Sequence, residues 1–253
     1  MENVDSGNVR LLPLGDAAWT VEFGREIDPA LHGRVLGLLD AVEKARAEGR
    51  LNGVVDLVPT FRSLTVHYDP FVSDGESLGR QLRELAQGAG TLSREGRHWR
   101  LPVCFDDDLA PDLADLAQAK GLTPQTVIEL LCATTFQVYM IGFMPGFPYM
   151  GGLPEALEMP RLSSPRKAVP ARSLAVAGSM CAVYPWESPG GWRLLGRTPI
   201  PLFNARDSQS PALLASGDRV SWRSIARPEY AELEATAQSG QLARETLLLG
   251  GRP

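Results

Sequence analysis

Residues 142–154 read GFMPGFPYMGGLP, and residues 183–199 read VYPWESPGGWRLLGRTP. Glycine permits positive φ and the close approach of two backbones, whereas proline fixes φ near one value, so stretches rich in both follow a sharply defined path without regular helix. Short strands joined by such turns are typical of a small β-barrel. We therefore expect the second part of the chain to be mainly β.

The same region combines aromatic and cationic side chains. The aromatic residues would supply apolar walls, and the cationic residues would donate hydrogen bonds to carboxylate or phosphate oxygens. This combination favours a site for a small anionic molecule or for the loop of a partner protein. The alternative is that the aromatic rings fill the barrel and the cations form surface ion pairs, which is our interpretation of Arg161. The side chains concerned are Phe143, Phe147, Tyr149, Tyr184 and Trp192, with Arg161, Arg166, Lys167 and Arg197.

These stretches, with PRKAVP at 165–170 and SGDRV at 216–220, resemble the family of 5-oxoprolinase B subunits, also called the KipI family. Its members have also been labelled allophanate hydrolase subunit 1, of the carboxyltransferase subdomain C/D type. The blocks LPLGD at 12–16 and VPTFRSL at 58–64 are similar to the opening of that family. The resemblance thus covers nearly the whole chain, and it implies a cyclophilin-like barrel.

The resemblance implies one component of a hydrolase complex that is inactive alone. Together with the A and C subunits it would open 5-oxo-L-proline to L-glutamate with hydrolysis of ATP, and Mg²⁺ is expected for the complex. The site of ATP on this chain is not given by the sequence, and no catalytic residue or metal ligand is assigned. The resemblance also implies two alternatives, an inhibitor of a sensor histidine kinase and a carboxyltransferase component of the allophanate hydrolase or urea carboxylase type.

Eight residues in the matching motifs are the predicted binding site for the small carboxylate substrate. Arginine presents a planar fork of donors to carboxylate or phosphate oxygens, and the two glycines would let backbone N–H groups approach the ligand. Asp218 is interpreted as shaping a turn and Arg62 as facing a partner protein of the complex. The eight predicted residues are Phe147, Tyr149, Arg166, Lys167, Gly190, Gly191, Trp192 and Arg197.

Three positions depart from the family pattern. Arg172 occupies the glycine position of VPAGS, residues 180–182 read MCA where QTG is common, and Leu131 stands where histidine is often found. We expect these departures to lie near the pocket and therefore to favour a divergent paralogue or a regulator.

Composition excludes several functions. The net charge of −5 argues against nucleic acid or an anionic membrane as the main partner. No apolar run approaches the roughly 20 residues of a membrane span, so a cytoplasmic protein is expected. The chain contains no GxxxxGK[ST] or GxGxxG nucleotide motif. His32, His67 and His98 are interpreted as structural or surface residues, and Cys104, Cys132 and Cys181 as buried thiols.

The hydrophobic pattern predicts two domains. Residues 1–90 are expected to form a small α+β domain of the order ββαββα, in which Asp28-Pro29 begins a helix and Gly49 ends it. Residues 87–96 are the expected linker, and residues 97–253 the expected barrel domain. In the barrel domain, residues 169–177 are predicted as one strand, Arg227-Pro228 as the start of a last polar helix, and the tail after Gly240 as weakly ordered. Asp106, Asp107 and Asp108 are predicted to form an exposed acidic turn, with a cation site as the alternative.

Overall fold

The computed structural model describes residues 9–90 and 96–250, which divide into two compact units on either side of residues 95 and 96. Half of the predicted linker, residues 91–95, lies outside the described residues, as do residues 251–253. The independent folding of domains 1–90 and 97–253 stays a prediction.

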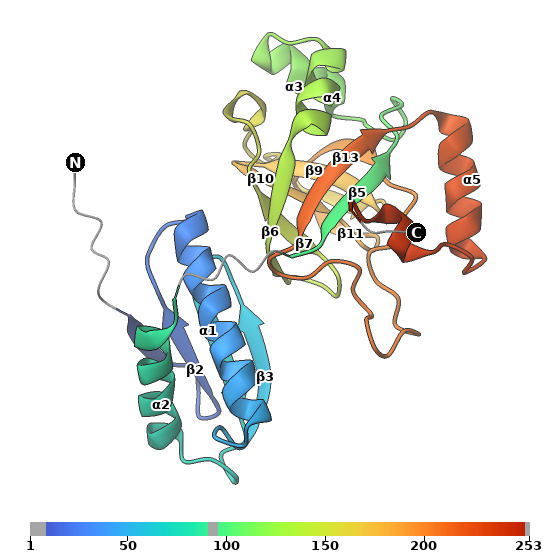
Figure 1. The fold of residues 1–253 in the computed structure, drawn as a ribbon. Coiled ribbons are helices and arrows are strands. Elements are labelled where there is room, and N and C mark those ends of the chain that lie inside the picture. The colour runs from blue at the N-terminus through green and yellow to red at the C-terminus, as the bar shows by residue number, and fades with distance from the viewer. Residues whose placement is uncertain (1–8, 91–95, 251–253) are drawn as a thin grey trace. The chain divides into compact units, whose positions relative to one another are not determined.

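The N-terminal unit has the predicted ββαββα order. Four antiparallel strands lie in the order β1-β2-β4-β3, and two helices pack on one face of this sheet (Figure 1). Between the sheet and the helices lies one hydrophobic core, which includes Val21, Leu38, Leu64 and Leu82. The strands are β1 (Arg10–Pro13), β2 (Ala18–Glu22), β3 (Val54–Pro59) and β4 (Ser63–Tyr68), and the helices are α1 (Pro29–Ala47) and α2 (Gly75–Gly88).

Helix α1 begins and ends where the sequence predicts. The carboxylate of Asp28 accepts hydrogen bonds from the backbone N–H groups of Ala30 and Leu31 at 2.8 and 3.0 Å, so it satisfies two donors that the first turn leaves open. Gly49, one residue beyond the cap, takes the left-handed φ of 71° that glycine adopts at little cost.

The second unit is built on a seven-stranded sheet of the order β12-β9-β10-β7-β6-β13-β5. Strand β13 pairs parallel to β5 and antiparallel to β6. Figure 1 shows these strands curving into a barrel-like layer, with α3 and α4 grouped at one end and α5 along one side. The strands are β5 (His98–Val103), β6 (Thr135–Ile141), β7 (Pro148–Gly151), β8 (Arg166–Val169), β9 (Ser173–Ala177), β10 (Met180–Val183), β11 (Ser188–Gly190), β12 (Arg193–Arg197) and β13 (Arg219–Ser224). The helices are α3 (Leu113–Lys120), α4 (Pro124–Ala133), α5 (Arg227–Gln238) and the short 3-10 turns Glu155–Leu157 and Arg244–Leu247.

The two edge strands of this sheet meet at one point. Cys104, directly after β5, and Arg197, the last residue of β12, exchange two backbone hydrogen bonds of 2.9 Å. Gly196 permits this approach, because a Cβ at that position would lie 2.7 Å from a methyl group of Val103. The sheet is therefore a nearly closed barrel, and the expectation of a mainly β second part is confirmed.

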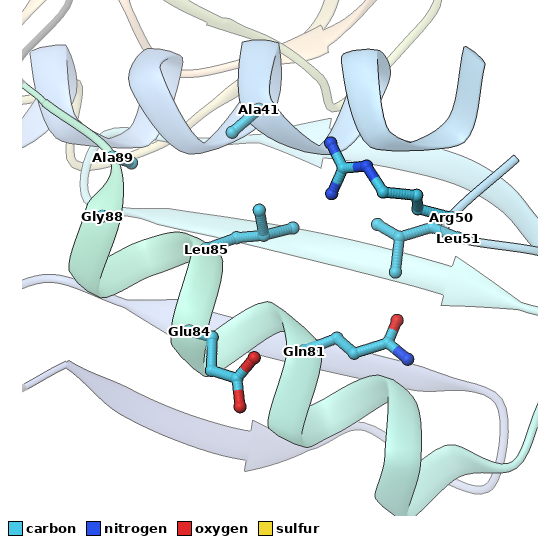
Figure 2. A pocket seen from close by; sticks show the side chains of 8 residues that line it. All are labelled: Ala41, Arg50, Leu51, Gln81, Glu84, Leu85, Gly88 and Ala89. Atoms are coloured by element: carbon cyan, nitrogen blue, oxygen red, sulfur yellow. The ribbon is translucent and has the colours of Figure 1, made fainter. Parts of the chain in front are cut away.

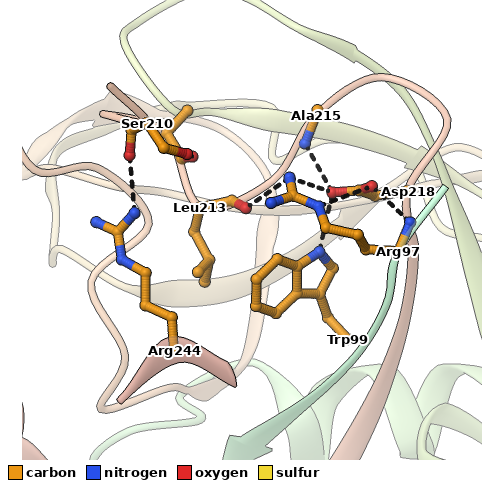
Figure 3. Close-up of polar contacts among 8 residues, drawn as sticks. Arg97, Trp99, Ser210, Leu213, Ala215, Asp218 and Arg244 are labelled. Carbon is orange, nitrogen blue, oxygen red and sulfur yellow. Dashed lines mark hydrogen bonds and ion pairs between the residues drawn. The ribbon is translucent and has the colours of Figure 1, made fainter. Parts of the chain in front are cut away.

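Asp218 fixes the loop that enters β13, which confirms its interpretation as a turn-shaping residue. Its buried carboxylate accepts from the backbone of Arg97 and of Ala215 and from Trp99 Nε1, at 2.9, 3.0 and 2.9 Å (Figure 3). Arg97 Nη2 lies 3.0 Å from the same carboxylate and 3.2 Å from the carbonyl of Leu213. Hydrogen bonds from both ends of the unit therefore converge on one aspartate.

Two sequence predictions about this unit are wrong. Residues 169–177 form two strands instead of one, because Pro170 offers no backbone N–H and Arg172 takes a φ of 68°, which turns the chain between β8 and β9. The tail after Gly240 is not weakly ordered over its described part: Leu247 is buried, and Leu249 donates a 2.7 Å backbone hydrogen bond to His98.

The structure also bears on the predicted acidic turn, the cysteines and the helices. Asp106, Asp107 and Asp108 form the turn after β5, and Asp108 is exposed and pairs with Arg227 at 3.0 Å, so the acidic turn is confirmed. The cysteines are free: Cys104 and Cys181 are buried as expected, whereas Cys132 is only half-buried. None of the helices formed by the described residues combines the length and apolar character needed to cross a bilayer.

Candidate functional site

The two glycine- and proline-rich stretches meet around one cavity of about 280 Å³ in the barrel unit. Strand β7, strand β11 and the loops beside them supply its walls, so two stretches that are well separated in the sequence line the same hollow. The lining residues are Phe143, Phe147, Tyr149, Arg161, Pro165, Tyr184, Pro189, Gly190, Gly191 and Trp192. We refer to it as the Trp192 cavity.

An aromatic cluster forms the walls of the Trp192 cavity. The buried ring of Phe147 stands edge to face against Tyr184 and Trp192, with centroids 5.2 and 6.1 Å apart. The ring centroid of Tyr149 lies 4.9 Å from that of Phe147 and 6.0 Å from that of Trp192. Offset and edge-to-face contacts of this kind hold the rings in defined positions. The cavity therefore has a rigid apolar wall before any ligand enters.

Two phenol groups and one guanidinium bring polarity to the cavity. The phenol hydroxyls of Tyr149 and Tyr184 are hydrogen-bond donors at neutral pH, and burial raises the pKa of both further. Arg161 is the charged side chain among the lining residues, and its guanidinium carbon lies 5.8 Å from the Trp192 ring centroid. Arg161 is exposed, as expected of a surface residue, but it forms no ion pair with a described residue and instead packs on Trp192 at the cavity wall.

Arg166 supports the cavity wall from behind. Its guanidinium lies 2.6 Å from the carboxylate of Asp112 and donates to the carbonyl of Trp192 at 3.3 Å. The same carboxylate accepts the backbone N–H of Leu194 at 2.6 Å. Asp112 is buried, so this pair ties the segment before α3 to β12 directly beside Trp192.

Five of the eight predicted substrate-binding residues line the Trp192 cavity, and three do not. Phe147, Tyr149, Gly190, Gly191 and Trp192 are brought together. Arg197 instead ends β12 and donates from Nε to the carbonyl of Ala171 at 2.8 Å. Lys167 is exposed on β8. The expected convergence of Arg166, Lys167 and Arg197 with Trp192 in one hollow is thus wrong, and the binding role of all eight stays a prediction.

Sequence reasoning missed Asp112 and undervalued Arg161 and Tyr184. Arg166 pairs along the strand with Gly190, yet its side chain turns to a carboxylate 54 positions away in the sequence. No local pattern marks Asp112, because its role exists only once β8, β12 and the segment before α3 lie together. For Tyr184, the following Pro185 and the aromatic spacing were the available signal.

Gly190 and Gly191 differ in the space available for a side chain, so alanine at each position should affect stability differently. A Cβ on Gly190 would lie 2.4 Å from the hydroxyl oxygen of buried Tyr184, whereas the nearest atoms to a Cβ on Gly191 lie at 3.7 Å. We expect Gly190→Ala to displace Tyr184 and cost about 1–3 kcal/mol of unfolding free energy, the usual cost of overpacking. Gly191→Ala is the matched control, with less than about 0.5 kcal/mol expected. Urea denaturation of both variants measures this, and equal values would contradict it.

Of the three departures from the family pattern, the one at 180–182 lies beside the Trp192 cavity as expected, whereas Leu131 and Arg172 are not among its lining residues. Leu131 is buried among the core residues that α4 packs against the barrel. Ala182 on β10 pairs with Tyr149 on β7, and it packs with Met180 in the hydrophobic cluster that contains Phe147, Tyr184 and Trp192. Arg172 binds the carboxylate of Glu234 on α5 and the carbonyl of Pro199, so it fastens α5 to the barrel. Its φ of 68° is a left-handed conformation that glycine adopts at little cost, which fits the glycine of the family pattern VPAGS.

A larger cavity, of about 530 Å³, lies in the N-terminal unit between α1 and α2 (Figure 2). It is lined by side chains such as Arg50, Gln81, Glu84 and Leu85. Arg50 forms an ion pair with Glu48, with Nη2 and Oε2 2.6 Å apart. None of the residues of the matching motifs lines this cavity. Its size alone therefore does not make it the functional site.

Comparison with known proteins agrees with the resemblance seen in the sequence. Residues 9–214 match the family model described as carboxyltransferase domain, subdomain C and D. The B subunit of 5-oxoprolinase from Bacillus subtilis (strain 168) is 37% identical over 228 residues, which cover 86% of this chain and 93% of that protein. The corresponding B subunit from Haemophilus influenzae is 41% identical over 167 residues, 66% of this chain and 78% of the relative.

Among solved structures, that of TTHA0988 is similar with a TM-score of 0.72 and 33% identity over 83% of this chain. The chain spans only 40% of TTHA0988. The Kluyveromyces lactis urea carboxylase shares the fold, with a TM-score of 0.74 and 19% identity, over 92% of this chain and 23% of that protein. With the motifs, the barrel and the matched length in agreement, this chain belongs to the family of 5-oxoprolinase B subunits, among the carboxyltransferase subdomain C and D proteins.

Proposed function

We propose that this chain is the B subunit of a cytoplasmic, ATP-dependent 5-oxoprolinase and opens 5-oxo-L-proline to L-glutamate together with the A and C subunits. The observation that carries the proposal is the 37% identity to a 5-oxoprolinase B subunit over 93% of that protein's length. We further propose that the barrel is of the cyclophilin-like type and that the chain has no activity alone.

The chemistry of the Trp192 cavity suits such a substrate. A five-membered lactam acid has a flat apolar ring, a carboxylate and an amide carbonyl. Arg161 would pair with the carboxylate, and the faces of Trp192 and Phe147 would pack on the ring. The protonated hydroxyls of Tyr149 and Tyr184 would donate hydrogen bonds to the carbonyl oxygen, where negative charge develops during ring opening.

ATP would supply the phosphoryl group that converts the unreactive lactam carbonyl into an electrophile. In that step this chain would hold the lactam ring of the substrate and keep water out of the apolar part of the Trp192 cavity. Among the described residues no group of three His, Cys, Asp or Glu side chains gathers to hold a metal ion. Mg²⁺ commonly needs only one or two carboxylates besides phosphate oxygens, so a complex that uses MgATP is compatible with this donor set.

The lengths of the relatives support the proposed partners. In TTHA0988 and in the K. lactis urea carboxylase, the region similar to this chain is one part of a longer polypeptide. We propose that the A and C subunits supply in separate chains what those proteins carry in one.

Reconstitution tests the proposed function directly. Co-expression of this chain with the A and C subunits is expected to give ATP-dependent release of glutamate from 5-oxoproline, and omission of this chain is expected to abolish it. The control is the complex without ATP. Undiminished turnover in the absence of this chain would reject the proposal.

Phe143 favours a second candidate function. This aromatic side chain is 66% exposed at the rim of the Trp192 cavity, at a φ of 68°, and its ring stands edge to face against Phe147 at 5.4 Å. An exposed aromatic beside a rigid pocket is typical of a protein-docking site. The second candidate is therefore the kinase-inhibitor role, tested by kinase autophosphorylation with wild type and Phe143→Ala.

The carboxyltransferase alternative is tested by assaying the same complex with urea.

A further inference from the structure

A second cavity in the barrel unit, of about 410 Å³, shares no lining residue with the Trp192 cavity. It lies between the loops that follow β10 and β12 and the segment that ends α5. Six of its lining residues carry the argument: Trp186, Phe203, Arg206, Leu213, Gln238 and Arg244. We refer to it as the Trp186 cavity, and neither the family motifs nor the relatives assign it a role.

An aromatic pair forms one wall of the Trp186 cavity. The indole of Trp186 is 47% exposed, although tryptophan is normally a highly buried residue. Its ring stands against Phe203 with centroids 6.1 Å apart at 66°, so one edge is fixed while much of the ring meets solvent. Buried Leu213 adds apolar surface. A planar ring entering here would stack on Trp186 and cover exposed apolar area.

Two arginines line the Trp186 cavity, Arg206 and Arg244. Arg244 uses Nη1 for both of its contacts, 3.2 Å to the carboxylate of Asp207 and 2.7 Å to the carbonyl of Ser210. Its Nε and Nη2 are thus left for a ligand. Arg206 is exposed and forms no ion pair with a described residue. No carboxylate of the described residues lines the cavity itself, and the Asp207 pair contacts only Nη1 of Arg244, so an anion between the two guanidiniums would still be stabilised.

The wall of this cavity is held in place before a ligand arrives. Leu213 is fixed through its backbone, since its N–H donates to Leu202 at 2.9 Å and its carbonyl accepts from Arg97. Arg97 is in turn held by Asp218 (Figure 3). Figure 3 shows the Arg244 contact to Ser210 on one side of Leu213 and the Asp218 network on the other. A pre-formed wall spares a ligand the ordering cost of binding.

We propose that the Trp186 cavity binds a planar aromatic molecule with an anionic tail, of the nucleoside phosphate class. The base stacks on Trp186, and the phosphates lie between Arg206 and Arg244. The volume is within the range of small-molecule sites. The proposal rests on the proposed function only for the choice of ATP as the first probe.

Calorimetric titration of the full chain with ATP and Mg²⁺, with adenosine and with tripolyphosphate tests the assignment. ATP is expected to bind more tightly than either fragment, because it alone uses the ring wall and the arginines together. Trp186→Ala is expected to weaken ATP binding at least about fivefold, and Trp186→Phe to restore part of it. Arg206→Gln and Arg244→Gln are each expected to weaken it by a similar factor.

Matched controls remove exposed groups of the same kinds elsewhere. Phe71→Ala deletes a 98% exposed aromatic of the N-terminal unit, and Arg223→Gln deletes an arginine paired with Glu229 on the surface. Both are expected to bind ATP like the wild type. Absence of ATP binding, equal binding of ATP and tripolyphosphate, or equal binding by wild type and Trp186→Ala would each overturn the assignment. In the reconstituted complex, Trp186→Ala should raise the KM for ATP and leave that for 5-oxoproline unchanged, which separates this proposal from the proposed function.

Discussion

Replacing Asp112 with alanine is expected to lower the free energy of unfolding of the barrel unit by about 3 kcal/mol, because a buried donor loses a charged acceptor. The Asp112 carboxylate accepts the buried N–H of Leu194 at 2.6 Å and pairs with Arg166 at 2.6 Å. Alanine leaves the N–H without a partner and releases Arg166, whose side chain is 27% exposed and can turn to water. Urea denaturation followed by tryptophan fluorescence measures the loss.

Asp115→Ala is the matched control for this prediction. Asp115 lies on the same segment, in the first turn of α3, but is exposed. Its replacement is expected to change stability by less than about 0.5 kcal/mol. A double-mutant cycle with Arg166→Gln separates the ion pair from the backbone hydrogen bond. Equal stability of Asp112→Ala and Asp115→Ala would show that the carboxylate does not hold β12 in place.

Replacing Arg161 with glutamine in the reconstituted complex is expected to lower kcat/KM for 5-oxoproline about 10- to 100-fold, the loss of one charge-assisted contact of about 1.5–3 kcal/mol. Arg161 is the cation that lines the Trp192 cavity among the described residues, and it rests on the Trp192 ring. If it binds the substrate carboxylate equally in the ground and transition states, the loss appears in KM while kcat stays nearly constant. Steady-state kinetics of glutamate release measures both parameters.

Two further variants define the role of Arg161. Arg161→Lys keeps the charge without the planar fork and is expected to recover part of the activity. Arg223→Gln removes an arginine whose exposed ion pair with Glu229 contributes little, and it is expected to behave as wild type. Full activity of Arg161→Gln would remove this residue from the site and, with it, the proposed orientation of the substrate.

Local sequence signals predicted the secondary structure of the N-terminal unit well. Asp28-Pro29 and Gly49 determine the ends of α1 through short-range hydrogen bonds and backbone geometry, which depend on a few adjacent residues. The glycine- and proline-rich stretches likewise predicted a rigid aromatic pocket, and Phe147, Tyr149 and Trp192 do meet in one cavity. The sequence predicted least well which cationic side chains line the Trp192 cavity.

By itself the sequence determined the family, the β character of the barrel unit and the aromatic wall, because motif residues and turn chemistry act over short distances along the chain. Only the tertiary structure decided which arginine faces the cavity. The sequence favoured Arg166 and Arg197 over Arg161 as binding residues, but Arg166 pairs with Asp112 and Arg197 donates to the carbonyl of Ala171. A guanidinium takes whichever acceptor the folded chain brings within reach, and these acceptors come from 54 and 26 positions away.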